Sequence, residues 1–547
     1  MTFLSADQLY QGGAQVGILS NLLDAPGVAK PTDAADAATL AAQLSEGLDV
    51  AIVPQSILGN EGAVYALARA AGPERSRRGE RMLFVCARAG ATALGVFEGE
   101  SCGRKIDGET LCTLVRPADH PNAVNLRGAL AFLRPQVLGL RKSFGFGDRL
   151  GLATPGHIRA VRGTSMRPIF AQQSIREMTR TQRTPQQVMD CATWGTLQEG
   201  FAETGGFGAD ADHLQRPEDI DATVAAGFTL FTIDPKAHVD DAADLESKAG
   251  VAEKFETLPW DSMETTPKDT CARYLAGAVN VSDRLAVEFT EETLLRAVVK
   301  YGRATLHVAR MHRHLASKAT GGGFELEASV DETETPTTVA EHYYIASELK
   351  RLGVRWVSLA PRFVGAFEKG VDYIGDLAEF EKTFADHVDV ARHLGPYKLS
   401  LHSGSDKFSV YPIAAKYADE LIHVKTAGTS YLEALRVVGE LDPALFREIL
   451  DFAVGRYEED KRTYHVSAKL AQVPRPASLG DDDLADLLDQ FDARQVLHVT
   501  YGSVLMTKDE TGRPRFRDRL LAVLKADPEA HAAALEKHLK RHVQPFA

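Results

Sequence analysis

Short apolar runs alternate with helical patterns along most of the chain. From about residue 144, each apolar run ends in a polar loop, and most are followed by a segment with helical periodicity. The predicted strands are Arg149–Ala153, Gly206–Asp210, Phe228–Ile233, Phe324–Ser329, Arg355–Leu359, Tyr397–Leu401, Leu421–Lys425 and Gln495–Thr500. The predicted helices are Pro217–Ala226, Glu291–Ala316, Thr338–Leu352, Leu377–Leu394, Tyr431–Glu440 and Asp481–Phe491. Strands that alternate with helices indicate a parallel sheet, and eight of them predict an α/β protein with a closed (β/α)8 TIM barrel.

The first 143 residues follow a different rhythm, in which Gly- and Arg-rich loops separate the apolar runs. Strands are predicted there at Asp49–Val53, Met82–Ala87 and Ala93–Phe97. We expect an N-terminal α/β extension at 1–143, packed on a catalytic barrel at 144–547 that carries an acidic insertion near 236–275. Residues 166–205 include polar text, which we interpret as the first barrel helix and a long connection. A doubly wound open sheet is the alternative fold, but no GxGxxG motif follows the first strand to support dinucleotide binding.

Composition excludes several classes of partner. The chain has 547 residues and a net charge of −13, so it lacks the electrostatic footprint of a nucleic-acid-binding protein. The sequence contains no apolar run of about 18 residues, so it predicts no membrane span. The N-terminal text MTFLSADQLYQGG lacks a basic region followed by an apolar core, so we expect no secretory signal and a cytoplasmic location. Five cysteines without a CxxC pair argue against a disulfide framework or a Cys-rich zinc site.

Chemically active side chains follow the predicted strands, where barrel enzymes carry their active sites. The segment 397–411, YKLSLHSGSDKFSVY, places His402 at a strand end and Ser403, Ser405 and Lys407 in the loop that follows. Another strand ends at Asp212-His213. Imidazole and carboxylate groups that converge at a barrel mouth favour a divalent zinc, manganese, iron, nickel or cobalt ion. One residue of the Asp-His pair can hold the metal while the other accepts a proton, although Asp212 is also a candidate helix cap.

Acidic and basic side chains add to this predicted site. Glu325 and Glu327 alternate along one strand and therefore share a face. We take Glu327 as a second acid/base, and an ion pair with Lys425 or Arg355 is the alternative. Fixed positive charges near the mouth suit an anionic substrate such as a sugar acid or sugar phosphate. The alternative is that these cations are ordinary surface side chains. The cations concerned are Arg362, Lys407 and Lys425.

Several loops resemble those of the tagaturonate epimerase family, which interconverts tagaturonate and fructuronate. The matching text is GFGDRLGLATPGHIRA (145–160), GFGADADHL (206–214), GFTLFTIDPKAHVDD (227–241), YKLSLHSGSDKFSVYPI (397–413), HVKTAGTSYLEALRVV (423–438) and HVTYGSVL (498–505). These segments are spread over about 145–505, so the resemblance covers most of the chain. It implies an isomerase of hexuronate metabolism.

A more distant similarity to class II metal-dependent aldolases implies roles for individual residues. Asp212-His213 resembles their Asp-His pair, and His402-Ser403-Gly404-Ser405 resembles their His-Gly-Gly-Ser-Gly strand end, with Ser403 in place of glycine. The similarity implies Asp212 as proton acceptor and His213 and His402 as metal ligands. It does not supply a third ligand; we choose His423 over Asp234 and His498, and assign Asp234 to substrate binding.

The implied reaction inverts a carbinol carbon that lies beyond the position acidified by the ketone. Enolisation cannot invert that carbon, whereas retro-aldol cleavage, rotation of the aldehyde fragment and re-addition can. We assign the two proton transfers to Asp212 and Glu327. The alternatives are a metal-dependent aldolase or isomerase of another sugar acid or sugar phosphate, and a non-catalytic sugar-acid binding protein. The sequence does not predict the oligomeric state or the role of 1–143.

Overall fold

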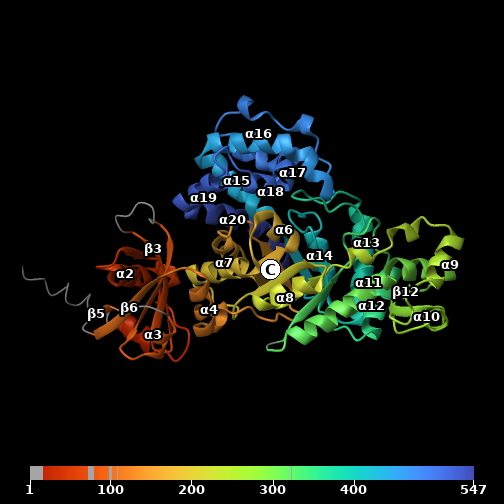
Figure 1. Cartoon of the computed structure of the whole chain (residues 1–547), viewed down its shortest axis with the longest axis horizontal. Coiled ribbons are helices and arrows are strands. Elements are labelled where there is room, and N and C mark those ends of the chain that lie inside the picture. The colour runs from red at the N-terminus through yellow and green to blue at the C-terminus, as the bar shows by residue number, and fades with distance from the viewer. Residues whose placement is uncertain (1–16, 72–78, 98–101, 107–108, 322) are drawn as a thin grey trace, which may run out of the picture. The chain divides into compact units, whose positions relative to one another are not determined.

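The computed structural model describes residues 17–71, 79–97, 102–106, 109–321 and 323–547 (Figure 1). The N-terminal text used to predict the absence of a secretory signal lies outside these residues. The chain forms two compact units. One comprises residues 1–135, 151–158 and 186–207, and the other comprises 136–150, 159–185 and 208–547. Within the described residues, no helix has both the length and the apolar character needed to cross a membrane.

The first unit contains an antiparallel sheet of six strands. Its elements are α2 (Ala34–Ser45), β1 (Val50–Ile52), β2 (Leu58–Asn60), β3 (Ala63–Ala70), β4 (Arg81–Arg88), α3 (Thr92–Val96), β5 (Cys102–Ile106), β6 (Glu109–Pro117) and α4 (His120–Ala129). Side chains of β3 alternate between two cores: Val64 packs with Leu40 and Leu44 of α2, whereas Tyr65 packs with Leu126 of α4. The strand predicted at Ala93–Phe97 is wrong, because this segment forms helix α3.

The second unit is built on a closed barrel of eight strands, which confirms the predicted fold class. In chain order the strands are β7 (Ser143–Gly147), β8 (Arg167–Ser174), β9 (Gly208–Leu214), β10 (Leu230–Ile233), β13 (Glu325–Ser329), β14 (Ser358–Ala360), β15 (Lys398–Leu401) and β16 (Ile422–Thr426). Each strand is parallel to its neighbours, and β16 pairs with β7 to close the ring. All carboxyl ends therefore lie at one mouth.

The helix predicted at Asp481–Phe491 is wrong, because the segment forms turns and a short 3-10 helix, Ala485–Asp489. Three predictions that concern the barrel strands also differ from the structure. The first barrel strand is Ser143–Gly147, upstream of the predicted Arg149–Ala153. The second is Arg167–Ser174, which lies within the stretch that we interpreted as a helix and connection. Its polar end is buried in the barrel, so polarity there marks the site and not a loop. The predicted strand Gln495–Thr500 is helical, because a segment buried on all sides lacks the period that separates a helix from a strand.

Helices lie between the barrel strands in the chain and continue after the last strand. Those between or after the strands are α5 (Thr154–Val161), α6 (Ile175–Thr181), α7 (Pro185–Gln198), α8 (Pro217–Ala225), α11 (Glu291–Lys318), α12 (Val339–Arg351), α13 (Leu377–Leu394), α14 (Tyr411–Ala418) and α15 (Thr429–Leu441). Most of α5 and of α7 belongs to the first unit. The chain then forms α16 (Pro443–Asp460), α17 (Phe491–Val499), α18 (Tyr501–Met506), α19 (Arg517–Ala526) and α20 (Pro528–Val543). Helices α15 to α20 gather at the top of the view in Figure 1.

The segment between β10 and α11 contains two helices and a hairpin. They are α9 (Lys248–Glu256), α10 (Pro267–Tyr274), and the paired strands β11 (Val279–Ser282) and β12 (Leu285–Val287). The segment is held to α11 by the buried Lys300, whose ammonium lies 2.7 Å from Asp244 and 3.3 Å from Glu341. In Figure 1, α9, α10 and β12 lie beside α11 and α12.

Candidate functional site

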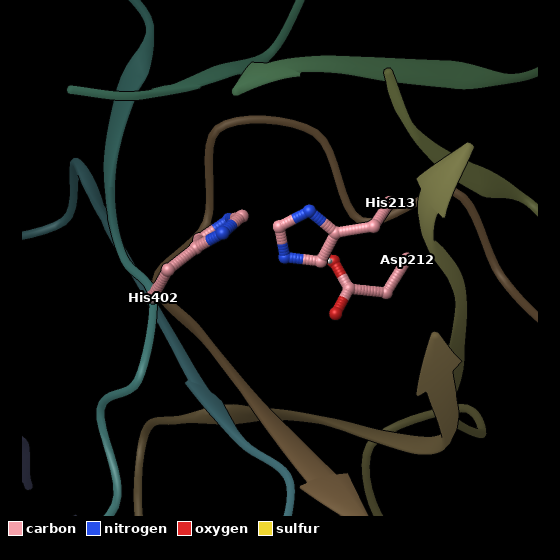
Figure 2. Close-up of side chains that lie close together, drawn as sticks. All are labelled: Asp212, His213 and His402. Carbon is pink, nitrogen blue, oxygen red and sulfur yellow. Dashed lines mark ion pairs between the residues drawn. The ribbon is translucent and has the colours of Figure 1, made fainter. Parts of the chain in front are cut away.

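Strand β9 ends in a bulge that turns two adjacent side chains toward the barrel mouth. Phe231 of β10 pairs with Ala211, but Ile233 pairs with Leu214, so β9 contains one extra residue. His213 has a φ of 53°, in the left-handed region that non-glycine residues rarely adopt. Because of this bend, Asp212 and His213 face the same space instead of opposite sides of the strand, as Figure 2 shows.

His402 approaches this pair from the end of β15. The next residue, Ser403, also has a left-handed backbone, with a φ of 49°. The ring centroids of His213 and His402 lie 5.1 Å apart, and potential ligand atoms of Asp212, His213 and His402 lie within 4.8 Å of one another (Figure 2). The structure thus brings together the three residues that the two loop motifs suggested.

Carboxylates flank both imidazoles. Asp234 Oδ2 lies 3.4 Å from His213 Nδ1, while Glu327 Oε1 and Asp331 Oδ1 lie 2.6 and 3.2 Å from His402 Nε2 and Nδ1. Burial disfavours the charged rings, but Asp212 and Asp234 outweigh it and raise the pKa of His213 to about 10. In the same way, Asp331 and Glu327 raise the pKa of His402 to about 9. The surroundings therefore favour positive charge between these side chains.

Lys425 joins three acidic residues next to the pair of histidines. Its ammonium is 2.8 Å from Asp210, 2.9 Å from Asp212 and 2.8 Å from Glu327. Burial alone would raise the pKa of Glu327, but Lys425 and His402 hold it well below its ordinary value. The predicted alternative for Glu327, an ion pair with Lys425, is therefore present, and the same carboxylate also contacts His402.

The residues at the mouth fit a divalent cation. Two imidazoles and a carboxylate form a mixed nitrogen and oxygen donor set that suits a transition ion. Nδ1 of His402 is buried without a hydrogen bond of good geometry, while Glu327 lies beside Nε2 of the same ring. Asp234 lies beside Nδ1 of His213, which leaves Nε2 of His213 as the nitrogen to bind a cation. The carboxylate beside each ring is the arrangement that orients metal-binding histidines in proteins. Asp212, His213 and His402 could therefore hold a metal ion.

Two predicted site residues lie elsewhere. His423 is one pleat below Lys425, where Nδ1 is 3.0 Å from Ser143 Oγ, and it is not part of the three-residue group. The Lys407 ammonium donates to the carbonyls of Glu368, Val371 and Ser405 at 2.7, 2.5 and 2.9 Å. Burial lowers the pKa of Lys407 to about 7. Neither His423 nor Lys407 lines the cavities at the mouth.

Three cavities adjoin at the barrel mouth. The inner one, of about 30 Å³, is lined by Gln172, Asp212, His213, Lys369, His402, Ser403, Ser405, Lys425, Ala427 and His498. Two outer cavities measure about 500 and 340 Å³. Arg362, a predicted substrate contact, lines the smaller outer cavity, and its guanidinium donates to the carbonyl of Thr333.

Several residues of the mouth were missed from the sequence. Arg149, Arg176, Lys369 and Tyr464 all line an outer cavity. Arg149 is buried against Glu177, with a separation of 2.7 Å, and its guanidinium lies 3.5 Å from the centre of the Tyr501 ring. A useful signal existed only for Arg149, since it follows the glycine-rich segment 143–147. Lys369 and Tyr464 lie in long loops whose paths no local pattern predicts.

Comparison with known proteins identifies the family. The sequence profile of the tagaturonate epimerase family matches residues 54–546. A tagaturonate/fructuronate epimerase from Thermotoga maritima is 45% identical over 447 residues, which make up 82% of this chain and 89% of the relative. The native crystal structure of the fructuronate-tagaturonate epimerase from Cohnella laeviribosi is 37% identical, with a TM-score of 0.83, and the match covers 94% of this chain and 99% of that one. Its complex with one glycerol gives the same identity and TM-score over 93% and 98% of the two chains. As its loops implied, the chain belongs to the tagaturonate epimerase family and is an enzyme of the isomerase class.

Proposed function

We propose that this protein interconverts D-tagaturonate and D-fructuronate with the help of a divalent transition cation. The observation that carries the proposal is the convergence of Asp212, His213 and His402 at one mouth, in a chain that belongs to this family. The catalytic groups belong to the barrel unit. The substrate is an anionic sugar acid, which agrees with the cationic side chains that line the outer cavities.

His213 and His402 would hold the cation, with Asp234 and Glu327 fixing the orientation of their rings. When bound, such a cation polarises the ketone and stabilises negative charge on the enediolate side of the cleaved substrate. Asp212 lies beside both rings and is ionised, because His213, Lys425 and His402 hold its pKa below the ordinary value although burial would raise it. An ionised carboxylate at this position can accept the hydroxyl proton that starts the retro-aldol cleavage.

The second proton transfer is assigned to Glu327. This carboxylate is fully buried, and its connection to the inner cavity runs through Lys425 and His402, which both contact it and both line that cavity. Lys425 bridges Asp212 and Glu327, so a proton can pass between the two carboxylates without entering bulk water. Ser403 and Ser405 present hydroxyl groups to the substrate in the same cavity.

The test is incubation of metal-replete protein with D-fructuronate, with product formation followed by NMR before and after treatment with a chelator. We expect tagaturonate to form, the activity to disappear with chelation, and the activity to return when a divalent ion is restored. Absence of tagaturonate would overturn the proposal and favour another sugar acid or a sugar phosphate. Unchanged activity in the chelated, metal-free protein would remove the cation from the mechanism.

A second experiment separates the metal-binding role from the proton-accepting role. Asp212→Asn keeps the size of the side chain but removes its capacity to accept a proton. We expect this variant to retain bound metal and lose most of its turnover, whereas His213→Ala is expected to lose both. Metal content measured by elemental analysis reads the first property, and the fructuronate assay reads the second. Loss of metal from Asp212→Asn would reassign Asp212 as a ligand.

A further inference from the structure

Lys369 occupies a unique position at the barrel mouth. It lines the inner cavity and both outer cavities, and within the described chain no other residue lines all three. Asp212 and His213 connect the inner cavity to the larger outer one, whereas His402 and Ser403 connect it to the smaller one. Lys369 therefore borders the space next to the two histidines from all three cavities.

The charge of Lys369 is not neutralised by the protein. Most other cations at the mouth have acidic partners: Arg149 with Glu177, Arg176 and Lys236 with Glu332, Arg216 with Asp219, and Lys425 with three carboxylates. The Lys369 ammonium donates to Ser403 Oγ at 2.6 Å, and no carboxylate of the described residues lies within 4.0 Å of it. Arg362 also lacks an acidic partner there, but it lines only the smaller outer cavity.

The backbone around Lys369 is held in place by two buried cations. The Lys407 ammonium donates to the carbonyls of Glu368 and Val371, and Arg494 donates to the carbonyl of Gly370 at 2.7 Å. The carbonyls on both sides of Lys369 are thus fixed from below, while its side chain reaches into the cavities. Such fixed backbone reduces the ordering that binding would otherwise require.

The volumes decide which part of the substrate lies near Lys369. A cavity of about 30 Å³ has room for the atoms that react but not for a whole six-carbon acid. The rest of the carbon chain therefore extends into an outer cavity, and Lys369 lines whichever of the two it enters. In a hexuronate, the carboxylate lies a short way along the same chain from the carbon that is inverted.

We propose that Lys369 binds the carboxylate of the sugar acid and makes the enzyme selective for the acid over the corresponding neutral ketose. This inference rests on the proposed function. The ammonium supplies a charge-assisted hydrogen bond to the carboxylate, and Ser403 keeps the flexible lysine stem aimed at the inner cavity. A neutral hydroxymethyl group in place of the carboxylate forms only the weaker neutral bond.

The test compares D-fructuronate with D-fructose, in which a hydroxymethyl group replaces the carboxylate. The variants are Lys369→Met, which removes the charge, and Lys369→Arg, which keeps it. Lys416→Met is the matched control, because Lys416 is exposed on α14 and pairs with Glu381. We expect Lys369→Met to raise KM for fructuronate roughly 10- to 100-fold. Its rate on fructose should stay close to that of the unmodified enzyme, and Lys369→Arg should recover most of the affinity.

Other outcomes would overturn the inference. An equal loss on both substrates, seen in kcat, would mean that Lys369 acts on the reacting atoms or supports His402 through Ser403. No change in either rate would exclude a role in binding. If the unmodified enzyme does not convert fructuronate at all, the proposed function fails first. Calorimetric binding of fructuronate to the unmodified protein and to Lys369→Met then tests the carboxylate contact separately, and equal affinities would refute it.

Discussion

Two buried clusters of histidine and carboxylate lie at opposite ends of one short loop. His402, at the start of the loop, faces Asp212 and His213 at the barrel mouth. Asp406, four residues later, contacts His538 at 2.6 Å, and its backbone N–H donates to His542 of the same helix, α20. Both clusters have the residue types of a metal site, and in both the ligand atoms lie within 4.8 Å of one another.

What distinguishes the two clusters is access to a cavity, because each contains a fixed cation, Lys425 at the mouth and Arg494 in the second cluster. Arg494 donates to both carboxylate oxygens of Asp406 at 3.1 Å and lies 3.3 Å from Glu433. A guanidinium already supplies the positive charge there, so the second cluster is a clamp that joins α17, α20 and the loop. At the mouth, carboxylates surround two imidazoles that line cavities. Residue type alone does not identify a site, and neither does a neighbouring cation; access to a cavity separates the two clusters.

The largest expected effect is that of His402→Ala. Loss of a proposed metal ligand should lower kcat/KM for fructuronate about 1000-fold, which corresponds to about 4 kcal/mol. Stability should change little, because Glu327 keeps Lys425 and Ser358 as partners. The assay is run alongside His538→Ala, which removes a histidine of the clamp. If His538→Ala loses activity to the same extent while remaining folded, the two clusters act as one catalytic unit and the comparison fails.

Arg494→Met should produce the next largest effect, this time on stability. It leaves Asp406 and Glu433 buried without their guanidinium, which costs about 3–5 kcal/mol in the free energy of unfolding. The shift of the urea midpoint measures this cost, and Lys416→Met should leave the midpoint unchanged because its ion pair is exposed. Turnover by the folded protein should fall less than about tenfold. An unchanged midpoint would show that Arg494 does not hold the clamp together.

The barrel could be predicted because six of its eight strands carry ordinary strand signals, whereas the other two, β7 and β8, carry no such signal. Strand β8 was missed because Gln172, Gln173 and Ser174 make its end polar, and this polarity exists because the end lines or adjoins the site. Strand β7 contains Gly145 and Gly147, and two glycines in five residues are typical of a loop. A Cβ atom at Gly147 would lie 2.7 Å from the carbonyl oxygen of Thr426, so the close approach of the neighbouring backbone requires glycine there.

The site could be predicted where a strand ends in a motif, as at Asp212-His213 and His402. It could not be predicted for Lys369, because the path of a long loop brings this residue to the mouth. It could not be predicted for Lys407 either, because the direction of the side chain determines whether this residue lines the mouth. Sequence pattern placed Lys407 at the mouth, but its stem turns inward to backbone carbonyls. A charged side chain in a strand-end loop can line a cavity or hold a neighbouring loop, and only the fold distinguishes these roles.

The clamp should also shape the response of stability to acid. Burial lowers the pKa of His542 to about 3, consistent with Nε2 accepting the N–H of Asp406 at 2.9 Å. The unfolded chain binds a proton at this histidine below about pH 6.5 and the folded one does not, so stability is lost as pH falls from about 6.5 to 3, at about 1.4 kcal/mol per pH unit. His542→Gln can accept the same N–H but does not titrate. In urea titrations at several pH values, it should reduce the slope of the free energy of unfolding against pH in this range by the equivalent of one proton. The exposed His393→Gln should leave this slope unchanged, and equal slopes in all three proteins would contradict the assignment.

Ser405→Ala should have the smallest effect and locates the boundary between the two clusters. Ser405 lines the inner cavity, whereas its carbonyl already accepts a bond from Lys407. Loss of one neutral hydrogen bond to substrate should raise KM for fructuronate about three- to tenfold and leave the urea midpoint unchanged. Ser409→Ala, which removes a hydroxyl that bonds Asp372 beyond the clamp, should change neither. If Ser405→Ala instead lowers the urea midpoint and leaves KM unaltered, Ser405 stabilises the fold and does not bind substrate. In that case only His402 and Ser403 of this loop belong to the site at the mouth.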